Sequence, residues 1–272
     1  MTGSDIATDQ LRTDPDLYRE HCRLPAAVLA WAGSDVGQQV RLRRGRECVL
    51  ATAVDTADRA VVPPGTAEML DEVGPIRVAG EAPTPRTSLA AGQFHERAIE
   101  GGPLVAVAPH GGTVEPHTDA QARRLAERGA AVWACNGWWP GGRAFDRWHV
   151  TSGDIHPASF PALDGLLGTG TGKRGRFEAA VSFHGWRHDG VGVGGGASRE
   201  TRQRVTEAVE RVLPPEVPVE RIDEGDYSGN SPENIVNWLT ADGTSGVQIE
   251  QSTGVRWRHG SGVADAVANV LL

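Results

Sequence analysis

The feature that most constrains the fold is a regular alternation of strand-like and helix-like segments from about Pro103 to the end of the chain. Short apolar runs such as PLVAVAP, AAVWACNG and FEAAVSFHGW are typical of buried strands, and SGVQIEQS, in which apolar and polar side chains alternate, predicts a further strand. The segments between them are amphipathic, and in residues 198–214 apolar side chains recur at helical spacing, at Val205, Ala208, Val209 and Val212. This alternation predicts an α/β domain with three layers, in which helices cover both faces of a mixed, mostly parallel sheet.

The preceding part of the chain shows a different pattern of apolar and polar residues. Residues 1–35 are polar and are interpreted as a separate N-terminal segment. From Gln38, apolar residues alternate with polar ones, and this pattern predicts a small β-rich module that ends in a Pro-rich linker, over residues 36–88. Residues 89–272 then form the α/β domain.

Composition excludes several classes of protein. The formal net charge of −8 argues against a nucleic-acid-binding protein, which usually presents a basic face. The three cysteines are widely spaced and match neither a disulfide framework nor a zinc knuckle, which favours a reducing compartment. No apolar run approaches about 18 residues, and the N-terminus does not resemble a signal peptide. We therefore expect a cytoplasmic protein without a membrane partner, which cell lysis can release; its oligomeric state stays open.

Two glycine-rich segments resemble nucleotide-binding loops. GTGTGKR, residues 168–174, lacks the first glycine of a phosphate-binding loop, because Leu167 stands there, and Arg174 replaces the magnesium-binding hydroxyl. GVGVGG, residues 190–195, fits the dinucleotide pattern but does not directly follow a strand. Both segments are interpreted as surface loops.

Polar side chains follow three of the predicted strands. The first strand ends at His110, with Glu115 five residues further on, the third ends at His184, and a later strand carries Glu250. In parallel sheets the carboxyl ends of the strands meet at one edge, where ligands bind. Two imidazoles and one carboxylate are a recurring ligand set for catalytic zinc. Each histidine taken alone is equally compatible with a hydrogen-bonded residue at the end of a strand.

Four motifs in order, APHGGTVEPHT, WHVTSGD, SFHGW and GVQIEQSTGVR, resemble those of the zinc-dependent poly-γ-glutamate hydrolases. The resemblance covers about residues 95–272 and leaves out the N-terminal module. It implies a fold similar to the zinc carboxypeptidases and one Zn²⁺ per chain. Gln251, after Glu250, departs from the apolar residue expected there.

The resemblance also implies residue roles. The metal ligands would be His110, Glu115 and His184, and Glu250 would act as general base. The residues that line the cleft would be His149, Thr151 and Ser152.

A polyanionic or otherwise carboxylate-bearing peptide substrate requires cations, and arginine grips carboxylates with two hydrogen bonds. Arg187 follows a candidate metal ligand and Arg256 follows the strand of Glu250, so both are candidates for this role.

These observations predict a zinc-dependent hydrolase of amide bonds that cleaves γ-glutamyl linkages. Two alternatives stay open. One is a zinc carboxypeptidase or an N-acyl-amino-acid deacylase. The other is a protein without catalytic activity that binds a metal or a polyanion.

Overall fold

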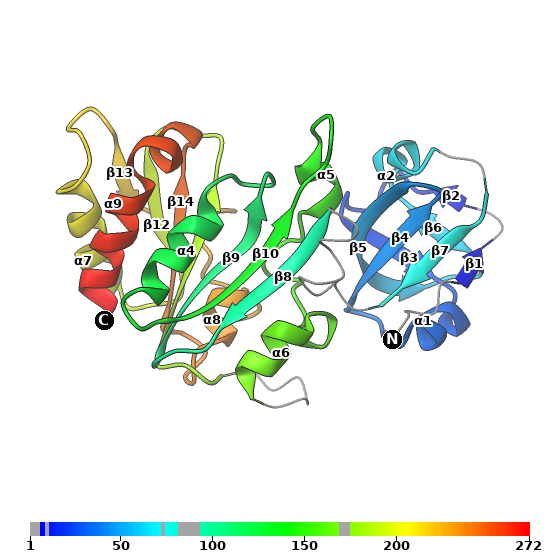
Figure 1. The fold of residues 1–272 in the computed structure, drawn as a ribbon, viewed down its shortest axis with the longest axis horizontal. Helices are drawn as coiled ribbons and strands as arrows, with labels where there is room; N and C mark the ends of the chain where they lie inside the picture. The colour runs from blue at the N-terminus through cyan, green and yellow to red at the C-terminus, as the bar shows by residue number, and fades with distance from the viewer. Residues whose placement is uncertain (1–5, 9–10, 72–73, 81–92, 169–174) are drawn as a thin grey trace.

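The computed structural model describes residues 6–8, 11–71, 74–80, 93–168 and 175–272. These residues form two mixed sheets that lie side by side, each with its own hydrophobic core (Figure 1). The predicted linker falls mostly on residues 81–88, and the predicted loop at GTGTGKR mostly on residues 169–174, so both lie outside the described residues.

The N-terminal module is a sheet with the strand order β1-β7-β4-β5-β3-β6-β2. Its strands are β1 (Ile6–Thr8), β2 (Leu11–Thr13), β3 (His21–Leu24), β4 (Gln39–Arg44), β5 (Glu47–Thr56), β6 (Ala60–Val62) and β7 (Ile76–Ala79). Two short helices accompany it, α1 (Ala26–Ala32) and α2 (Pro64–Met69). Residues 1–35 are therefore not a separate segment where they are described, because β1, β2 and β3 pair with strands of the predicted module.

The second sheet carries the alternation seen in the sequence. Its strand order is β13-β12-β14-β11-β9-β10-β8. The strands are β8 (Phe94–Ile99), β9 (Leu104–Gly112), β10 (Ala131–Gly137), β11 (Ala179–Gly185), β12 (Val191–Gly194), β13 (Val219–Arg221) and β14 (Gly246–Gln251). Neighbouring strands in the centre, from β14 to β10, are parallel, whereas β8 and β12 pair antiparallel with β10 and β14. The predicted mixed, mostly parallel sheet is confirmed.

Helices lie on both faces of this sheet. One face is covered by α4 (Thr118–Ala126), α7 (Arg199–Glu210) and α9 (Thr253–Leu271), whose apolar side chains pack on alternate strand residues such as Ala106 and Ala108. The other face packs against α5 (Ala144–Trp148), α6 (Pro161–Leu167) and α8 (Ile235–Trp238), with the short turn η1 (Pro157–Ser159) beside them. In the described part of the chain, the helices are too short or too polar to cross a bilayer.

One local expectation was wrong. The glycine-rich segment GVGVGG is not a loop, because its residues Val191–Gly194 form the buried strand β12. A side chain at Gly192 would meet Ile222 and Trp186 within 2.7 Å, so glycine is required by close packing rather than by a nucleotide. Helix α8 begins at Ile235, because the Asn234 side chain accepts the backbone N–H of Val236 and caps it.

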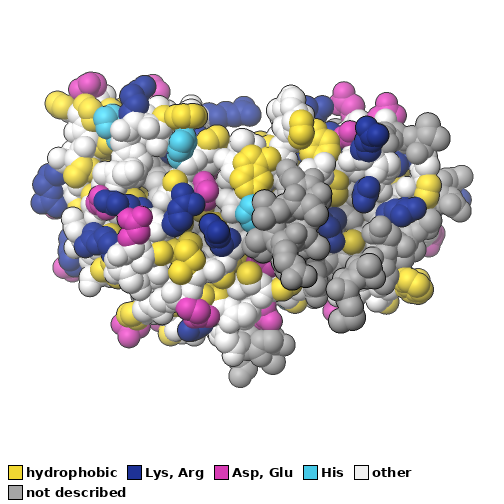
Figure 2. Space-filling model, in the orientation of Figure 1, with side chains coloured by type: hydrophobic (Ala, Val, Ile, Leu, Met, Phe, Trp, Pro, Cys, Tyr) yellow, Lys and Arg dark blue, Asp and Glu magenta, His cyan; other side chains and the backbone are white. Residues whose placement is uncertain are grey.

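The two sheets are held together by polar contacts and by Leu50 of β5, which packs in the core under α5 and α6. The backbone N–H of Gln39 donates to Ser159 Oγ at 2.8 Å, and His21 Nε2 lies 2.8 Å from Asp154 Oδ2. Acidic and basic side chains are interspersed over the face of the α/β domain shown in Figure 2.

All three cysteines are free thiols. Cys22 and Cys48 belong to the N-terminal sheet, whereas Cys135 lies in β10 of the second sheet. Burial raises the pKa of Cys22 to about 12 and that of Cys48 to about 11, and it raises the pKa of Cys135 well above its ordinary value.

Candidate metal centre

Three adjacent parallel strands, β9, β11 and β14, bring the candidate residues to one edge of the second sheet. His110 lies near the end of β9 and His184 near the end of β11. Glu250 of β14 pairs directly opposite His184 in the register of the two strands. The parallel arrangement therefore gathers groups that are 140 residues apart in sequence, from His110 to Glu250.

The loop after β9 returns Glu115 to this edge. The backbone N–H of Glu115 donates to the carbonyl of His110 at 2.7 Å, which closes the loop. Gly112 has a positive φ of 71°, a conformation that other residues adopt only with strain. A side chain at Gly111 would meet Asn136 Oδ1 at 2.4 Å. The two glycines after His110 are thus needed for the tight return.

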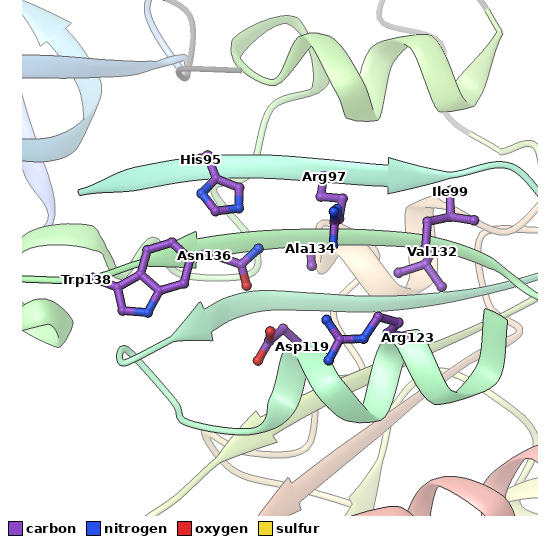
Figure 3. Close-up of a pocket in the computed structure, with 9 residues that line it drawn as sticks. All are labelled: His95, Arg97, Ile99, Asp119, Arg123, Val132, Ala134, Asn136 and Trp138. Carbon is purple, nitrogen blue, oxygen red and sulfur yellow. The ribbon is translucent and has the colours of Figure 1, made fainter. Parts of the chain in front are cut away.

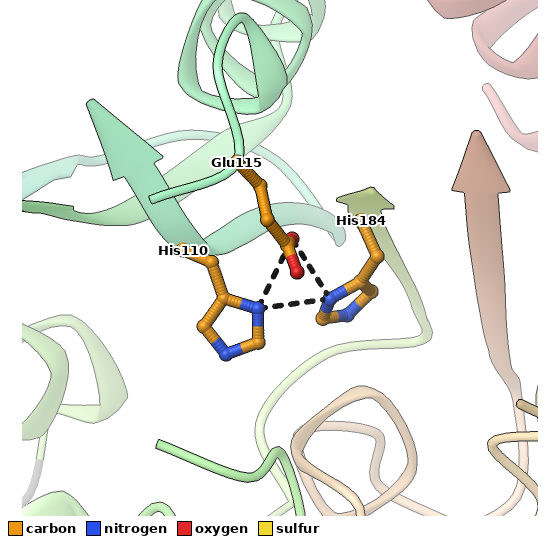
Figure 4. Close-up of side chains that lie close together, drawn as sticks. All are labelled: His110, Glu115 and His184. Atoms are coloured by element: carbon orange, nitrogen blue, oxygen red, sulfur yellow. Dashed lines mark hydrogen bonds and ion pairs between the residues drawn. The ribbon is translucent and has the colours of Figure 1, made fainter. Parts of the chain in front are cut away.

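His110, Glu115 and His184 point toward one another (Figure 4). His110 Nδ1 lies 3.1 Å from Glu115 Oε2 and 3.2 Å from His184 Nδ1, and His184 Nδ1 lies 3.6 Å from Glu115 Oε2. All three side chains are buried. Two imidazole nitrogens and one carboxylate oxygen therefore face a common point inside the protein.

Neighbouring groups fix the orientation of this cluster. His110 Nε2 lies 2.9 Å from the carbonyl oxygen of Val150, which makes Nε2 the donor, so that in the neutral ring the lone pair of Nδ1 faces the cluster. The backbone N–H of Gly185 donates to Glu115 Oε2 at 3.0 Å. Both ligand atoms are thus held before any ion binds.

The charges in the cluster are coupled. Burial alone would raise the pKa of Glu115, but His110 and His184 outweigh it and hold this pKa well below its ordinary value. Burial alone would lower the pKa of His110, but the Glu115 carboxylate raises it. Burial lowers the pKa of His184. The carboxylate is therefore ionised and at least one imidazole is neutral, as metal binding requires.

The donor set and its spacing fit zinc. Zn²⁺ is bound by His nitrogen and carboxylate oxygen at about 2.0–2.2 Å in tetrahedral geometry. Two ligands of a tetrahedron at that distance are separated by about 3.3 Å. The three separations in the cluster, 3.1, 3.2 and 3.6 Å, lie close to that edge. Two facing Nδ1 atoms without a cation between them would repel unless one were protonated.

Glu250 lies beside the cluster and is buried. Gln248, two residues earlier on the same strand, donates from Nε2 to Glu250 Oε1 at 3.0 Å. Burial and then the charge of Glu115 raise the pKa of Glu250 well above its ordinary value. A carboxyl group whose pKa is raised in this way binds a proton more readily than a carboxyl group exposed to water.

Arg256 reaches the same edge from the first turn of α9. Its side chain is buried, and its NH2 donates to Thr253 Oγ1 at 3.1 Å. Its Nε and NH1 have no hydrogen-bond partner among the described residues. NH1 would lie only 2.2 Å from a side chain at Gly185, so the guanidinium packs directly on the strand that carries His184. Buried unpaired N–H groups are costly unless a ligand accepts them.

The other predicted residues occupy two different environments. Arg187 is exposed in the turn after β11. The ring of His149 lies against that of His110, with the centroids 3.9 Å apart and the planes tilted by 31°, and its Nε2 lies 4.0 Å from Glu115 Oε1. The Thr151 hydroxyl donates at 2.9 Å to Glu20 of the N-terminal module, while Ser152 accepts a backbone hydrogen bond from Ile235 at 2.9 Å.

Sequence reasoning missed Glu20 and Gln248. Glu20 is buried and accepts hydrogen bonds from both His149 and Thr151. Nothing in its local sequence marks it, because its partners lie about 130 residues away. Gln248 had a visible signal, since it shares a strand face with Glu250 at a spacing of two residues.

A separate hollow of about 310 Å³ lies between α4 and the edge strand β8 (Figure 3). Arg97, Arg123 and Asp119 line it, and His95 and Trp138 stack at 5.0 Å at one end. It contains none of the cluster residues and is not part of the candidate metal centre.

Solved structures of other proteins superpose on this fold. A bacteriophage poly-γ-glutamate hydrolase superposes with a TM-score of 0.52 at 23% identity, covering 65% of this chain and 87% of the phage protein. YndL in its zinc-free apo form gives 0.53 at 23% identity, with 66% and 90% covered. A metallo-carboxypeptidase from Pseudomonas aeruginosa gives 0.41 at 14% identity, with 98% and 96% covered.

The sequence itself is more specific. Residues 93–260, more than half of the chain, match the family described as poly-gamma-glutamate hydrolase. The chain therefore belongs to the poly-γ-glutamate hydrolase family, and it is a hydrolase by that membership. The match begins at residue 93, after the N-terminal sheet. No protein of curated function matches the sequence.

Proposed function

We propose that the protein is a zinc-dependent amidohydrolase that cleaves γ-glutamyl amide bonds. The observation that carries this proposal is the spacing of His110 Nδ1, His184 Nδ1 and Glu115 Oε2, 3.1–3.6 Å, which suits three ligands of one tetrahedral zinc. Bound there, Zn²⁺ would act as a Lewis acid on the scissile carbonyl and would lower the pKa of a water molecule to about 7. The proposed stoichiometry is one zinc per chain.

Glu250 is the proposed general base. Its position opposite His184 in the strand register sets its carboxylate beside the metal ligands. Its raised pKa favours uptake of the proton from the attacking water and its later release to the leaving amine. Gln248 holds one carboxylate oxygen, which limits rotation of the group between these two steps.

Arg256 is the proposed site for a carboxylate of the substrate. Its unpaired Nε and NH1 atoms offer donors in a buried setting, where a charge-assisted hydrogen bond is strong. Each residue of a γ-linked polyglutamate carries a free α-carboxylate, which is the group that an arginine fork recognises. Arg187 is exposed and could hold a carboxylate further along such a chain.

The decisive variant is Glu250→Gln, measured for metal content and for turnover of γ-linked polyglutamate. We expect about one zinc per chain, as in the parent, and a turnover at least about 100-fold lower, because the proton acceptor is lost and the ligands are not. Glu210→Gln, an exposed change at the end of α7, is the control and should retain full activity. Full activity of Glu250→Gln would refute the assigned base.

A substrate panel separates this proposal from its alternatives. α-Linked peptides and N-acyl amino acids should be cleaved much more slowly than γ-linked polyglutamate. Preference for either would redirect the assignment to a carboxypeptidase or a deacylase. A well-folded parent that takes up no zinc would instead favour a protein that binds without catalysis.

A further inference from the structure

The N-terminal module reaches the edge of the second sheet through one buried carboxylate. Glu20 lies immediately before β3 and is 5% exposed. Its backbone carbonyl accepts the N–H of Thr52 on β5 at 2.8 Å, so the residue is anchored in the N-terminal sheet. Its side chain, however, makes most of its contacts with the second domain.

The carboxylate of Glu20 has every acceptor position filled. Oε1 accepts from Arg19 Nε at 3.1 Å and lies 2.5 Å from His149 Nδ1. Oε2 accepts the backbone N–H of Thr151 at 2.7 Å and its hydroxyl at 2.9 Å. An ionised carboxylate only accepts hydrogen bonds, so His149 Nδ1 must carry the proton.

This contact determines how His149 faces the candidate metal centre. With Nδ1 protonated, the neutral ring has its lone pair on Nε2, and Nε2 lies 4.0 Å from Glu115 Oε1. The ring is held between two others, with its centroid 4.4 Å from Phe145 and 3.9 Å from His110. A hydrogen-bond acceptor is thus directed at the cluster from outside the ligand set.

We propose that Glu20 is a positioning residue of the hydrolase site, which holds His149 in its Nδ1–H tautomer, and that the site is complete only when the N-terminal module is docked. The inference rests on the proposed function, in that His149 Nε2 accepts a hydrogen bond from the substrate or the attacking water. It gives the module a role that family membership does not supply, because the family match begins at residue 93.

A matched control is available at the same interface. Glu47 of β5 forms an ion pair with Arg147 of α5, with 2.5 Å between Oε2 and NH2. Arg147 also lies over the ring of Trp139, at 3.7 Å. Glu47→Gln therefore removes a charged contact between the domains without touching His149.

The experiment uses the full chain as Glu20→Gln, Glu20→Ala and Glu47→Gln. The first readout is the nitrogen NMR spectrum of metal-free protein labelled with ¹⁵N-histidine, with His149 assigned by its loss in His149→Asn. We expect the Nδ1–H tautomer in the parent and in Glu47→Gln. A mixture of tautomers is expected in Glu20→Gln and Glu20→Ala. If Glu20→Ala does not fold, Glu20→Gln keeps the size of the side chain and still removes the charge.

The second readout is kcat and KM with zinc bound. Loss of a residue that orients a group beside a metal site typically lowers activity 10–100-fold. We expect such a fall in kcat for both Glu20 variants and parental kcat for Glu47→Gln. An unchanged His149 tautomer in Glu20→Ala, or an equal loss of kcat in Glu47→Gln, would overturn the proposal. If the parent cleaves none of the substrates tried, the proposed function fails, while the tautomer still tests the role of Glu20.

Discussion

Acidification should weaken the protein specifically through Glu20, and the size of this effect can be worked out from its surroundings. Burial opposes ionisation of this carboxyl, but the hydrogen bonds from His149 and Thr151, the positive charge that His149 carries once acid protonates its ring, and the charge of Arg19 outweigh it and lower the pKa from 4.5 to about 2. At about 1.4 kcal/mol for each pH unit, this difference corresponds to about 3 kcal/mol of stability at neutral pH. Because Glu20 is 5% exposed, solvent screens little of it.

Acid destabilises the protein through Glu20 because the pKa of this carboxyl is lower in the folded state than in the unfolded state. A group whose pKa is lower in the folded state binds fewer protons there than in the unfolded state, so its contribution is full above its unfolded pKa and declines as the pH falls. For Glu20 the decline starts near the unfolded pKa of 4.5 and ends near the folded pKa of about 2. Between pH 5 and pH 3 the contribution should fall by about 2 kcal/mol.

The assay compares urea unfolding of metal-free parent and Glu20→Gln at several pH values between 7 and 3, followed by tryptophan fluorescence. Because Gln has no charge to lose, the difference in unfolding free energy between the two proteins should shrink by about 2 kcal/mol over the acidic range. Glu68→Gln, an exposed change on α2, should keep the pH dependence of the parent. Parallel curves for the parent and Glu20→Gln would refute the reasoning.

The remaining predictions concern the metal centre and its arginine. His110→Ala and His184→Ala should each lose the bound zinc that mass spectrometry detects in the parent, because two ligands do not hold the ion tightly. A parental zinc content in either variant would exclude that residue as a ligand. Arg256→Gln should raise KM roughly 10–100-fold, the equivalent of a charge-assisted hydrogen bond of about 1.5–3 kcal/mol, whereas Arg258→Gln, exposed on the same helix, should leave KM unchanged. Gly185→Ala should imitate Arg256→Gln, since the new methyl group would displace the guanidinium.

The fold could be predicted from the sequence best where burial imposes a regular spacing of apolar side chains along the chain. Central strands such as β9 and β10 are continuous apolar runs because both of their faces are buried, whereas α7 shows apolar residues at helical spacing because only one of its faces is buried. Polar groups at the ends of such strands identify the edge at which His110, Glu115 and His184 meet. These features depend only on neighbours in the chain.

Features that depend on contacts between residues far apart in the sequence could not be predicted from it. The sequence of strand β12 resembles a loop because close packing, and not a periodic pattern of side chains, requires its glycines. A side chain at Gly194, for instance, would meet the Ser228 carbonyl oxygen at 2.4 Å. The three-residue strands β1 and β2 are too short for any period and exist through pairing with β7 and β6. Glu20 acts through a histidine in the other domain, and no sequence pattern connects them.

The positions of the thiols allow the opening of each of the two sheets to be detected separately. Because the reactive form of cysteine is the thiolate, the raised pKa values make Cys22 and Cys135 inert as long as their surroundings stay packed. Cys22 reports on the N-terminal sheet and Cys135 on the second sheet. The rates at which a thiol reagent modifies these two positions, resolved by peptide mapping, distinguish domains that open together from domains that open one at a time. Because the proposed site uses residues of both sheets, it is disrupted whenever either sheet opens. Whether the two sheets open together or separately therefore determines how often the site is lost.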